Sequence, residues 1–395
     1  MSASKRLSVA TAIGLSLSLL TTSEALAYTF TRIADSNDPF GNFGISSPGI
    51  NNEGTVAFQA SLDAGGFGIF TNSNGIITTI ADTSGPFSIL NDPAINDQGT
   101  VVFNAFLDVG ANGNFTNGIF SSSNGVITTI ADASGPFSLL GAGPSINNEG
   151  TVAFGAFLDT DTGSLDLEST GTFTSSNGVI TTIADTSGSF GGINFYPDIN
   201  DEGTVVFLAY PRAGGQGIFT SNGGATTTIA DSSGPFSSFG LSSAINNNGT
   251  VAFTARLDSG VVGIFTGSGA ATTTIADTNG LFDGFIFVPE INNAGTVAFV
   301  AFPETGGTGI FTGPDPVSDK VIATGDTLLG STVTSLNFEI GLNDEGQIAF
   351  GATLADGTVG IFRADPEPVA VPEPTSILGV LVAGALGAAS RRKRM

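Results

Sequence analysis

The sequence predicts an all-β protein, a seven-bladed β-propeller of four-stranded blades closed into a ring by its N-terminal strand. One observation is a motif, Asn-x-x-Gly followed four residues later by Phe, that occurs seven times in the 395 residues. Another is the spacing of these copies, 45 to 53 residues, which is typical of propeller blades. A third is that one repeat is divided between the two ends of the chain. The leading residues of the copies are Asn51, Asn96, Asn147, Asn200, Asn246, Asn292 and Asn343.

The motif itself predicts a tight turn followed by a strand. In the copy that starts at Asn246, Asn at the first turn position and Gly249 at the fourth are typical of a type I turn closed by a residue with positive φ. In residues 250–257, Val251 and Phe253 belong to an alternating apolar face. The opposite face carries small residues, so we expect a strand that is packed on both sides.

Each repeat contains four strands. The first is the stretch before the Asn turn, and the second is the strand after the turn, described above. The third is Gly-Ile-Phe or a close variant, at Gly68, Gly118, Gly171, Gly217, Gly263, Gly309 and Gly360. The fourth is Thr-Thr-Ile-Ala-Asp, which starts at Thr78, Thr128, Thr181, Thr227 and Thr273 and diverges at 321–326. We expect the first strands to line the central channel and the Thr-rich fourth strands to form the outer edge.

The two ends of the propeller segment complement each other. The seventh repeat stops after Gly360-Ile361-Phe362 without a fourth strand, whereas residues 28–36 contain a fourth strand without a repeat. Pairing them closes the ring and leaves no open edge between the first and last blades. The alternative fold is a β-solenoid, but parallel β-helix repeats are much shorter, and an open solenoid gains nothing from a divided repeat.

The N-terminal residues predict export. Lys5 and Arg6 precede an uncharged run over residues 7–22, and Ala25 and Ala27 are spaced for cleavage. This pattern predicts a signal peptide over residues 1–27, with a buried N-terminal helix as the alternative. The propeller then covers residues 28–365, and residues 366–371 form a linker.

The C-terminal residues 372–395 form a three-part signal. Pro372, Glu373 and Pro374 open it, the 17 residues from Pro374 to Ser390 carry no charge, and 391–394 are basic. The uncharged run is at the low end of what spans a bilayer, and the basic tail would remain cytoplasmic. The arrangement resembles the PEP-CTERM sorting signal of exported Gram-negative bacterial proteins. The resemblance implies an exosortase partner, transient residence in the inner membrane, removal of the helix, and a cell-surface or extracellular location.

The repeat also resembles a known pattern. Exported proteins with tandem Asn-x-x-Gly-x-x-Ala-Phe repeats and interchangeable C-terminal anchors share it. Six copies here end in Val-Ala-Phe or Val-Val-Phe, and the seventh ends in Ile348-Ala349-Phe350. The resemblance covers nearly all of residues 28–365. The resemblance implies a repeat scaffold and a C-terminal anchor. It implies no catalytic residues for this chain.

Composition excludes several functions. Without Cys or His the chain has neither disulfides nor Ser/His or Cys/His triads, so we expect no catalytic residues of that kind and no enzyme. Residues 28–371 contain 5 basic and 33 acidic residues, a net charge of 5 − 33 = −28. Such an acidic protein repels phosphate backbones, which excludes nucleic acid as a partner.

The acidic residues gather on one expected face. Strand order places there the Asp that ends each fourth strand, at Asp35, Asp82, Asp132, Asp185, Asp231, Asp277 and Asp326, and four loop residues, Asp63, Asp108, Asp159 and Asp258. We expect each of these Asp side chains to cap the backbone of its own turn. No cofactor is expected beyond weak Ca²⁺, bound at about 10⁻⁴ to 10⁻³ M by the long loop with Asp159, Asp161, Asp166 and Glu168. A plain solvated acidic loop is the alternative.

These features predict an exported protein of the cell surface or extracellular matrix that acts as a binding module or as a structural module. Exopolysaccharide or a surface protein is the expected partner. Two alternatives remain open. One is a glycan-active enzyme with paired carboxylates at the channel mouth. The other is a purely structural coat component.

Overall fold

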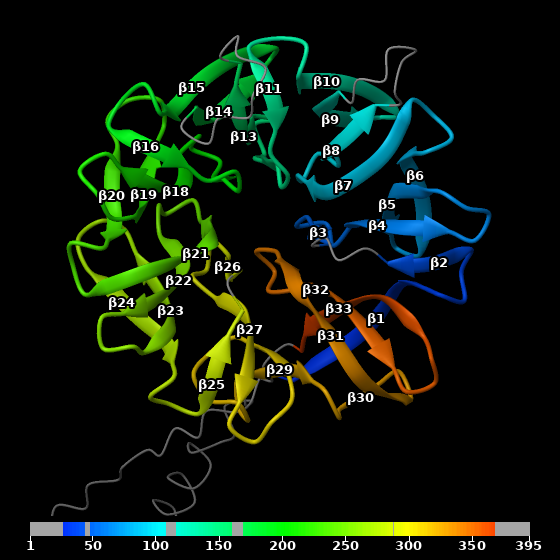
Figure 1. Ribbon diagram of the computed structural model, residues 1–395. Helices are drawn as coiled ribbons and strands as arrows, with labels where there is room; N and C mark the ends of the chain where they lie inside the picture. Colours follow the sequence, from blue (N-terminus) through cyan, green and yellow to red (C-terminus); the bar gives the residue numbers. More distant parts are fainter. Residues whose placement is uncertain (1–26, 44–47, 108–115, 160–168, 287, 368–395) are drawn as a thin grey trace, which may run out of the picture.

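The computed structural model describes residues 27–43, 48–107, 116–159, 169–286 and 288–367. Within them, seven small antiparallel sheets surround a central channel as the blades of a propeller (Figure 1). Each sheet takes its strands from one repeat, except the seventh, which recruits the N-terminal strand. The predicted fold class is therefore confirmed, and the β-solenoid alternative is excluded.

The first four blades follow one another along the chain. Blade 1 contains β2 (Phe40–Phe43), β3 (Gly49–Ile50), β4 (Val56–Leu62), β5 (Phe67–Ser73) and β6 (Ile76–Asp82). Blade 2 contains β7 (Phe87–Ile95), β8 (Val101–Leu107), β9 (Asn117–Ser123) and β10 (Val126–Asp132). Blade 3 contains β11 (Phe137–Leu140), β12 (Ser145–Ile146), β13 (Val152–Leu158), β14 (Thr170–Ser176) and β15 (Val179–Asp185). Blade 4 contains β16 (Phe190–Ile193), β17 (Asp198–Ile199), β18 (Val205–Pro211), β19 (Gly217–Ser221) and β20 (Thr227–Asp231).

The remaining blades complete the ring. Blade 5 contains β21 (Phe236–Ile245), β22 (Val251–Leu257), β23 (Val262–Gly267) and β24 (Thr272–Asp277). Blade 6 contains β25 (Phe282–Phe285), β26 (Glu290–Ile291), β27 (Val297–Pro303), β28 (Gly309–Phe311) and β29 (Lys320–Ala323). Blade 7 contains β30 (Thr327–Leu328), β31 (Ser331–Leu342), β32 (Ile348–Leu354), β33 (Val359–Pro366) and β1 (Tyr28–Asp35).

The first strand of each blade is less regular than the repeat suggests. In blades 1, 3, 4 and 6 it consists of two short strands that both pair with the second strand. In blade 5 it is continuous, but its register against β22 shifts between Phe239 and Ser243. The residues of this break leave the ladder and line the channel. The irregularity therefore shapes the candidate site.

Phe side chains from neighbouring strands form the centre of each blade. In blade 5, Phe236, Phe253 and Phe265 come from the first three strands, and their ring centroids lie 5.2 to 5.9 Å apart. Such edge-to-face and offset contacts add to the stabilisation from burial. The Gly of each Gly-Ile-Phe segment makes room for this packing. A Cβ on Gly263 would lie 2.8 Å from the Ala276 carbonyl oxygen and 3.1 Å from the Phe265 ring.

Both faces of each blade are buried against a neighbour. Phe253 is fully buried in a cluster that includes Val206 and Leu208 of blade 4. Ala252, one residue earlier, points the other way and packs in the cluster of Phe299 in blade 6. The predicted alternation of large and small residues is confirmed. It lets adjacent sheets approach closely on both sides.

The seven Asn turns form a closed ring of hydrogen bonds around the channel. Within a turn, the Asn246 side-chain oxygen accepts the backbone N–H of Thr250 at 3.0 Å. The same side chain donates through Nδ2 to the carbonyl oxygen of Asn292 in the next blade, also at 3.0 Å. Equivalent bonds of 2.9 to 3.1 Å link all seven blades, and the last runs from Asn343 back to Asn51. The leading Asn is therefore both a turn residue and a joint between blades.

A second ring of bonds runs through the residue after each leading Asn. Asn52, for example, donates its backbone N–H to Oδ1 of Asp97 at 2.8 Å. Seven such bonds of 2.7 to 2.9 Å close the circle through Asn52, Asp97, Asn148, Asp201, Asn247, Asn293 and Asp344. The two rings surround a small polar cavity of about 150 Å³. They make this end, which we call the Asn-turn face, the narrow end of the channel.

The turn geometry gives a direct test at Gly249. Its φ is +73°, and an added Cβ would meet no atom within 4 Å, so a substitution there strains only the backbone. We expect Gly249→Val to lower the free energy of unfolding by about 1 to 2 kcal/mol. Gly249→Asn should cost less, because Asn tolerates this conformation. Urea denaturation of both variants checks this, and equal stability of Gly249→Val and the parent would contradict the turn.

The ring closes where β1 pairs with β33. Seven residue pairs join the two strands, from Tyr28 opposite Pro366 to Asp35 opposite Gly360. The N-terminal strand is therefore the fourth strand of blade 7, as predicted. It also contacts the first blade, because Nδ2 of Asn72 donates to the carbonyl oxygen of Ile33 at 2.5 Å.

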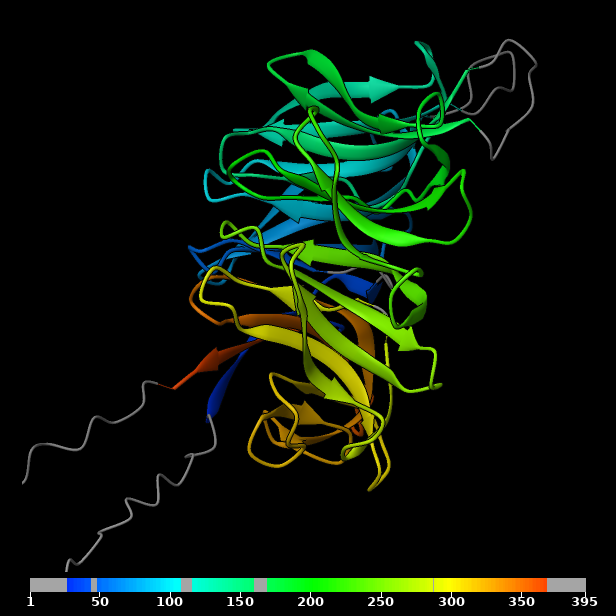
Figure 2. The same cartoon turned by 90° about the vertical axis from the view of Figure 1, so that its left-hand side faces the viewer.

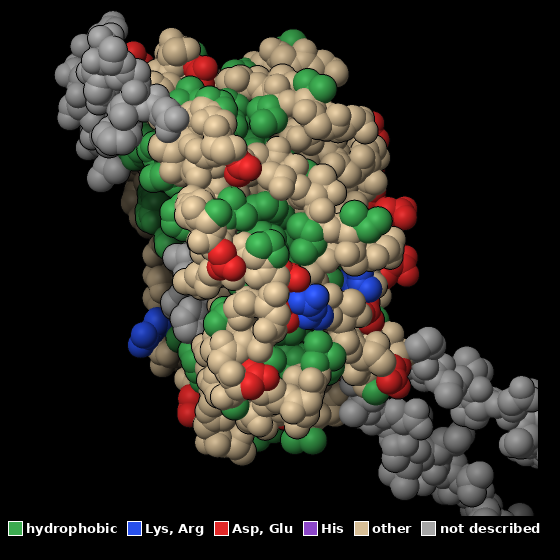
Figure 3. Space-filling model, turned by 90° about the vertical axis from the view of Figure 1, so that its right-hand side faces the viewer, with side chains coloured by type: hydrophobic (Ala, Val, Ile, Leu, Met, Phe, Trp, Pro, Cys, Tyr) green, Lys and Arg blue, Asp and Glu red, His purple; other side chains and the backbone are tan. Residues whose placement is uncertain are grey.

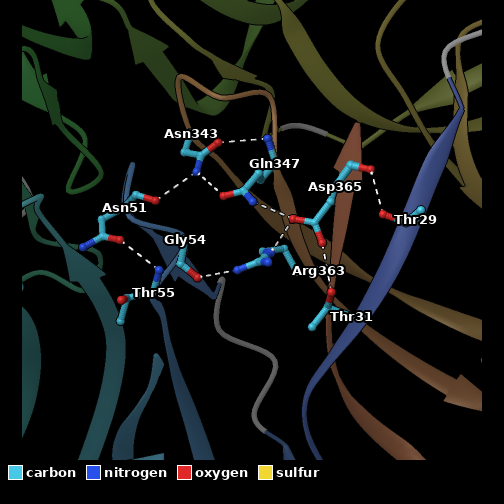
Figure 4. Close-up of polar contacts among 9 residues, drawn as sticks. All are labelled: Thr29, Thr31, Asn51, Gly54, Thr55, Asn343, Gln347, Arg363 and Asp365. Atoms are coloured by element: carbon cyan, nitrogen blue, oxygen red, sulfur yellow. Dashed lines mark hydrogen bonds and ion pairs between the residues drawn. The ribbon is translucent and has the colours of Figure 1, made fainter. Parts of the chain in front are cut away.

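A polar network marks the junction between blades 7 and 1 (Figure 4). Arg363 donates to the Gly54 carbonyl oxygen of blade 1 and pairs with Asp365, both at 2.7 Å. Thr31 of β1 donates to the same carboxylate at 2.9 Å. Other repeats have Thr or Ser where blade 7 has Arg363. Arg363 therefore distinguishes the junction between blades 7 and 1 from the other junctions in the sequence.

Candidate functional site

A cavity occupies the wide part of the central channel. It has a volume of about 520 Å³, and first strands from all seven blades line it. Much of its wall is apolar, formed by Pro, Ile and Leu side chains such as Ile50 and Leu241. Among the described residues of this wall there is no Lys or Arg. The prediction that the first strands line the channel is correct.

Two tiers of side chains face this cavity. The lower tier comes from the residue two positions before each leading Asn. Five of its members are small, namely Gly49, Ala94, Ser145, Ala244 and Gly341, and two are acidic, Asp198 and Glu290. The upper tier, four positions before each Asn, contains Asp92, Gly143, Tyr196, Ser242, Val288 and Glu339. The acids thus come from only some of the blades.

The small residues of the lower tier let the blades approach one another. A Cβ on Gly49 would lie 3.1 Å from the Pro93 carbonyl oxygen, and one on Gly341 would overlap the Pro48 carbonyl oxygen. A larger side chain therefore has no space at these two positions of blades 1 and 7. The acidic members of the tier, Asp198 and Glu290, belong to blades 4 and 6.

Asp198 is fixed by hydrogen bonds from two neighbouring blades. Ser145 Oγ of blade 3 donates to Oδ1 at 2.6 Å, and the backbone N–H of Ile245 in blade 5 donates to Oδ2 at 2.9 Å. Burial in the channel wall raises the pKa of the Asp198 carboxyl above its ordinary value, and these hydrogen bonds oppose the shift. Its position is therefore well defined, but its charge is disfavoured.

Glu290 has a different environment. Within the described residues, no donor forms a hydrogen bond with its carboxyl. Burial, followed by the nearby charges of Asp198 and Glu339, raises the pKa of Glu290 well above its ordinary value. A positive charge or a hydroxyl donor placed between these acids would relieve the repulsion.

Tyr196 completes the upper tier beside the acids. Its side chain is 42% exposed toward the wide end of the channel. Burial of the rest of the ring, with the charges of Asp92 and Glu339, raises the pKa of its phenol above the ordinary value. Tyr196 therefore remains a neutral hydroxyl that can donate or accept, with an aromatic face at the mouth of the channel.

The raised pKa of Glu290 predicts a pH-dependent effect on stability. A carboxyl whose pKa is higher in the folded than in the unfolded protein destabilises the fold as the pH rises above the unfolded value, here 4.5. Glu290→Gln should therefore melt at a higher temperature than the parent at pH 7. The difference should vanish below pH 4.5. Melting curves from pH 3.5 to 8 check this, with Glu53→Gln as an exposed control of equal charge change.

The Asp residues that end the fourth strands lie at the opposite end of the ring from the Asn turns, as expected. Most of those described cap their own turns: Asp82, for example, accepts the backbone N–H of Ser84 at 2.8 Å. The same pattern recurs at Asp35, Asp132, Asp185, Asp231 and Asp277. Asp326 instead accepts from Lys320 at 2.9 Å. Their role as turn caps is sufficient to explain them.

Several predicted site residues lie outside the described part of the chain. These are Ala25 of the signal peptide, the sorting residues Pro372, Glu373 and Pro374, the loop residue Asp108, and Asp161, Asp166 and Glu168 of the calcium loop. Asp159 is described, and its backbone N–H donates to the Pro136 carbonyl oxygen at 2.9 Å. The described residues contain no group of three acidic side chains placed to hold a metal ion. Calcium binding by the long loop remains a prediction.

The channel acids were missed by the sequence analysis, although a signal for them exists. Acids at strand ends and in loops are more numerous and conceal this signal. Aligning the seven repeats on their leading Asn instead shows Asp198 and Glu290 at a position that is otherwise Gly, Ala or Ser. An acid that replaces a small residue at an inward-facing position is a stronger indication than an acid in a loop.

Comparison with solved structures agrees with the fold. The chain is similar to an acylaminoacyl peptidase in complex with Z-Gly-Gly-Phe-chloromethyl ketone, with 12% identity, a TM-score of 0.51, and coverage of 78% of this chain and 50% of that one. The Pyrococcus horikoshii acylaminoacyl peptidase gives 12% identity, a TM-score of 0.49 and coverage of 78% and 50%. KlAtg21, in complex with the coiled-coil of AgAtg16, gives 12% identity and a TM-score of 0.48, with coverage of 80% of this chain and 99% of that one. The chain spans about half the length of the two peptidase chains.

The similarity to the first of these structures shows the fold alone. No curated protein matches the chain. In the described residues, no helix is long and apolar enough to span a membrane. The PEP-CTERM protein-sorting motif matches residues 370–394.

Fold, channel and sorting motif together define a class: a seven-bladed propeller with an acidic central channel and a C-terminal sorting motif that implies export and processing by an exosortase-type enzyme. Within that class, the chain belongs to the family of unknown function DUF7453, whose profile matches residues 22–138, 133–338 and 314–378.

Proposed function

We propose that the protein is a cell-surface binding module whose ligand enters the wide end of the channel. The observation that carries this proposal is the pair Asp198 and Glu290, in a tier where the other five blades have Gly, Ala or Ser. Removing carboxylates even partly from water without a cationic partner opposes folding, and both side chains are partly buried. A ring that served only as a scaffold would gain nothing from them. A cavity of about 520 Å³ also lies in the size range of small-ligand sites.

The chemistry of the wall indicates the class of ligand. Carboxylates accept hydrogen bonds from hydroxyl groups and attract amines, and the described wall offers no Lys or Arg to an anion. Tyr196 adds an aromatic face and a hydroxyl at the mouth. We infer that the ligand is a neutral or amine-bearing saccharide, such as the end of an exopolysaccharide chain.

A glycan array followed by calorimetry tests the proposal on the mature protein. A neutral or amino-sugar ligand should bind. Asp198→Asn combined with Glu290→Gln should weaken binding at least about tenfold, because each substitution replaces one carboxyl oxygen with an NH2 donor and removes the capacity for negative charge. The control is Glu304→Gln, an exposed acid outside the channel wall. No binding of any saccharide, or binding that the double variant leaves intact, would favour a purely structural coat component.

A second candidate function is a glycan-active enzyme. It is favoured by the difference between the two acids: the pKa of Glu290 is raised well above its ordinary value, whereas hydrogen bonds to Asp198 oppose the rise of its pKa. Glycosidases pair a protonated acid with an ionised carboxylate. An assay for new reducing ends on each saccharide that binds separates the two functions. An enzyme should lose turnover in Glu290→Gln while still binding its ligand. A binding module should show no turnover in either form.

A further inference from the structure

Both chain ends leave the ring on its Asn-turn face. β33 ends at Pro366 opposite Tyr28, the first residue of β1. In blades 1 to 3, a tight hairpin connects the third and fourth strands at this place, for instance Asn74-Gly75 between β5 and β6. The start of β1 and the end of β33 lie on the same side of the disc (Figure 2). The chain ends therefore stand at the level of the hairpin tips.

This position sets the orientation of the ring at a membrane. The apolar run of the sorting motif starts at Pro374, seven residues after Glu367 (374 − 367 = 7), the last described residue. Seven extended residues reach at most about 25 Å. While that run resides in a bilayer, the Asn-turn face stays close to the membrane surface. The wide mouth of the channel, at the opposite end, points outward.

The hairpin tips of three consecutive blades are unusually apolar. Ile76, Val126 and Val179 are 71%, 65% and 65% exposed, and each is followed by an exposed Ile. The tips, residues 73–77, 123–127 and 176–180, contain no charged residue. On the side of the ring that includes blades 1 and 2, hydrophobic side chains gather in patches and acidic ones are scattered (Figure 3). We call these three tips the aliphatic rim.

Blades 4 and 5 provide an internal comparison. Their corresponding tips contain Gly223-Gly224-Ala225 and Gly269-Ala270-Ala271, and their fourth strands β20 and β24 are shorter. The same repeat thus tolerates small residues at this position. The aliphatic side chains of blades 1 to 3 are therefore not required by the fold, and exposed clusters of this kind mark contact surfaces.

We propose that the aliphatic rim contacts the lipid bilayer while the C-terminal segment is anchored there. The rim lies at the level where the anchored chain leaves the ring, and blade 1, its first member, adjoins blade 7. Exposed carboxylates nearer the channel axis, Glu53, Glu149, Glu202 and Glu345, resist dehydration on the same face. The ring therefore tilts onto blades 1 to 3 instead of lying flat. These carboxylates also make neutral lipid a better surface than anionic lipid.

Fluorescence on the full chain tests this contact. Since the chain has no Cys, single substitutions allow specific labelling with an environment-sensitive fluorophore. The matched positions are Ser123→Cys on the rim, Ser268→Cys at the tip of blade 5, and Ser259→Cys at the wide mouth. In phosphatidylcholine nanodiscs with spin-labelled lipid, we expect at least threefold stronger quenching at position 123 than at 268. Position 259 should show none.

A second variant separates contact with lipid from contact with another protein chain. Ile76→Ser, Val126→Ser and Val179→Ser together, in the Ser123→Cys background, should abolish the quenching. The circular dichroism spectrum should stay unchanged, because these side chains are exposed. Equal quenching at all three positions would overturn the proposal. So would a fluorescence shift that appears without lipid and grows with protein concentration, because it would assign the rim to a second copy of the chain. Neither outcome depends on the channel ligand.

Discussion

Removing residues 28–36 should open the ring and cause the largest loss of stability among the changes considered. The deletion takes away the outer strand of blade 7 and exposes the edge of β33. It also removes Ile33 and Ala34, which are buried between blades 7 and 1, and Phe30, which packs against Phe350 with ring centroids 6.2 Å apart. We expect a loss of more than about 5 kcal/mol, since deleting one large buried side chain costs about 2 to 5 kcal/mol.

Thermal melts of mature chains that begin at Tyr28 and at Asn37 measure this effect. The shortened chain should also aggregate, because β33 then offers free backbone donors and acceptors to other chains. A peptide of residues 28–36 added in trans should restore part of the melting temperature, whereas a scrambled peptide should not. The double substitution of Thr29 and Thr31 by Ala, which keeps the strand, is the control. An unchanged melting temperature of the shortened chain would contradict closure of the ring by this strand.

Phe253→Ala should give the second largest effect, a loss of about 3 to 5 kcal/mol in the free energy of unfolding. The side chain has no exposed surface and contacts Phe236, Phe239 and Phe265 at centroid distances of 5.9 Å. It also lies against Val206 and Leu208 of blade 4. Truncation therefore leaves a cavity at the boundary between two blades. Rigid sheets on both sides limit how far the site can collapse.

Urea denaturation followed by circular dichroism checks the Phe253 prediction. Thr273→Ala is the matched control, because Thr273 is exposed on the fourth strand of the same blade. It should change the stability by no more than about 0.5 kcal/mol. If both variants unfold with the parent, the register in which Phe253 points between blades is wrong.

Local patterns of the sequence determined the fold of this protein. The period-two alternation around Phe253 specified which face of each second strand is buried, and the Asn and Gly positions specified the turns. Counting the repeats gave seven blades, and the divided repeat gave the closure by residues 28–36. These features are readable because the same short-range geometry recurs in every copy, so that each repeat confirms the others.

Only the tertiary structure revealed how the copies act on one another. The amide of Asn246 reaches the backbone of Asn292, 46 residues away, because adjacent blades place the two turns side by side. Ser145, Asp198 and Ile245 come from three blades and meet in the channel wall. No local pattern encodes such contacts. The raised pKa of Glu290 likewise depends on the low dielectric and the neighbouring charges that appear only when the ring is closed. The sequence by itself determined the scaffold, since scaffold contacts repeat along the chain, whereas the closed ring decided the candidate site, because that site consists of positions where the repeats differ.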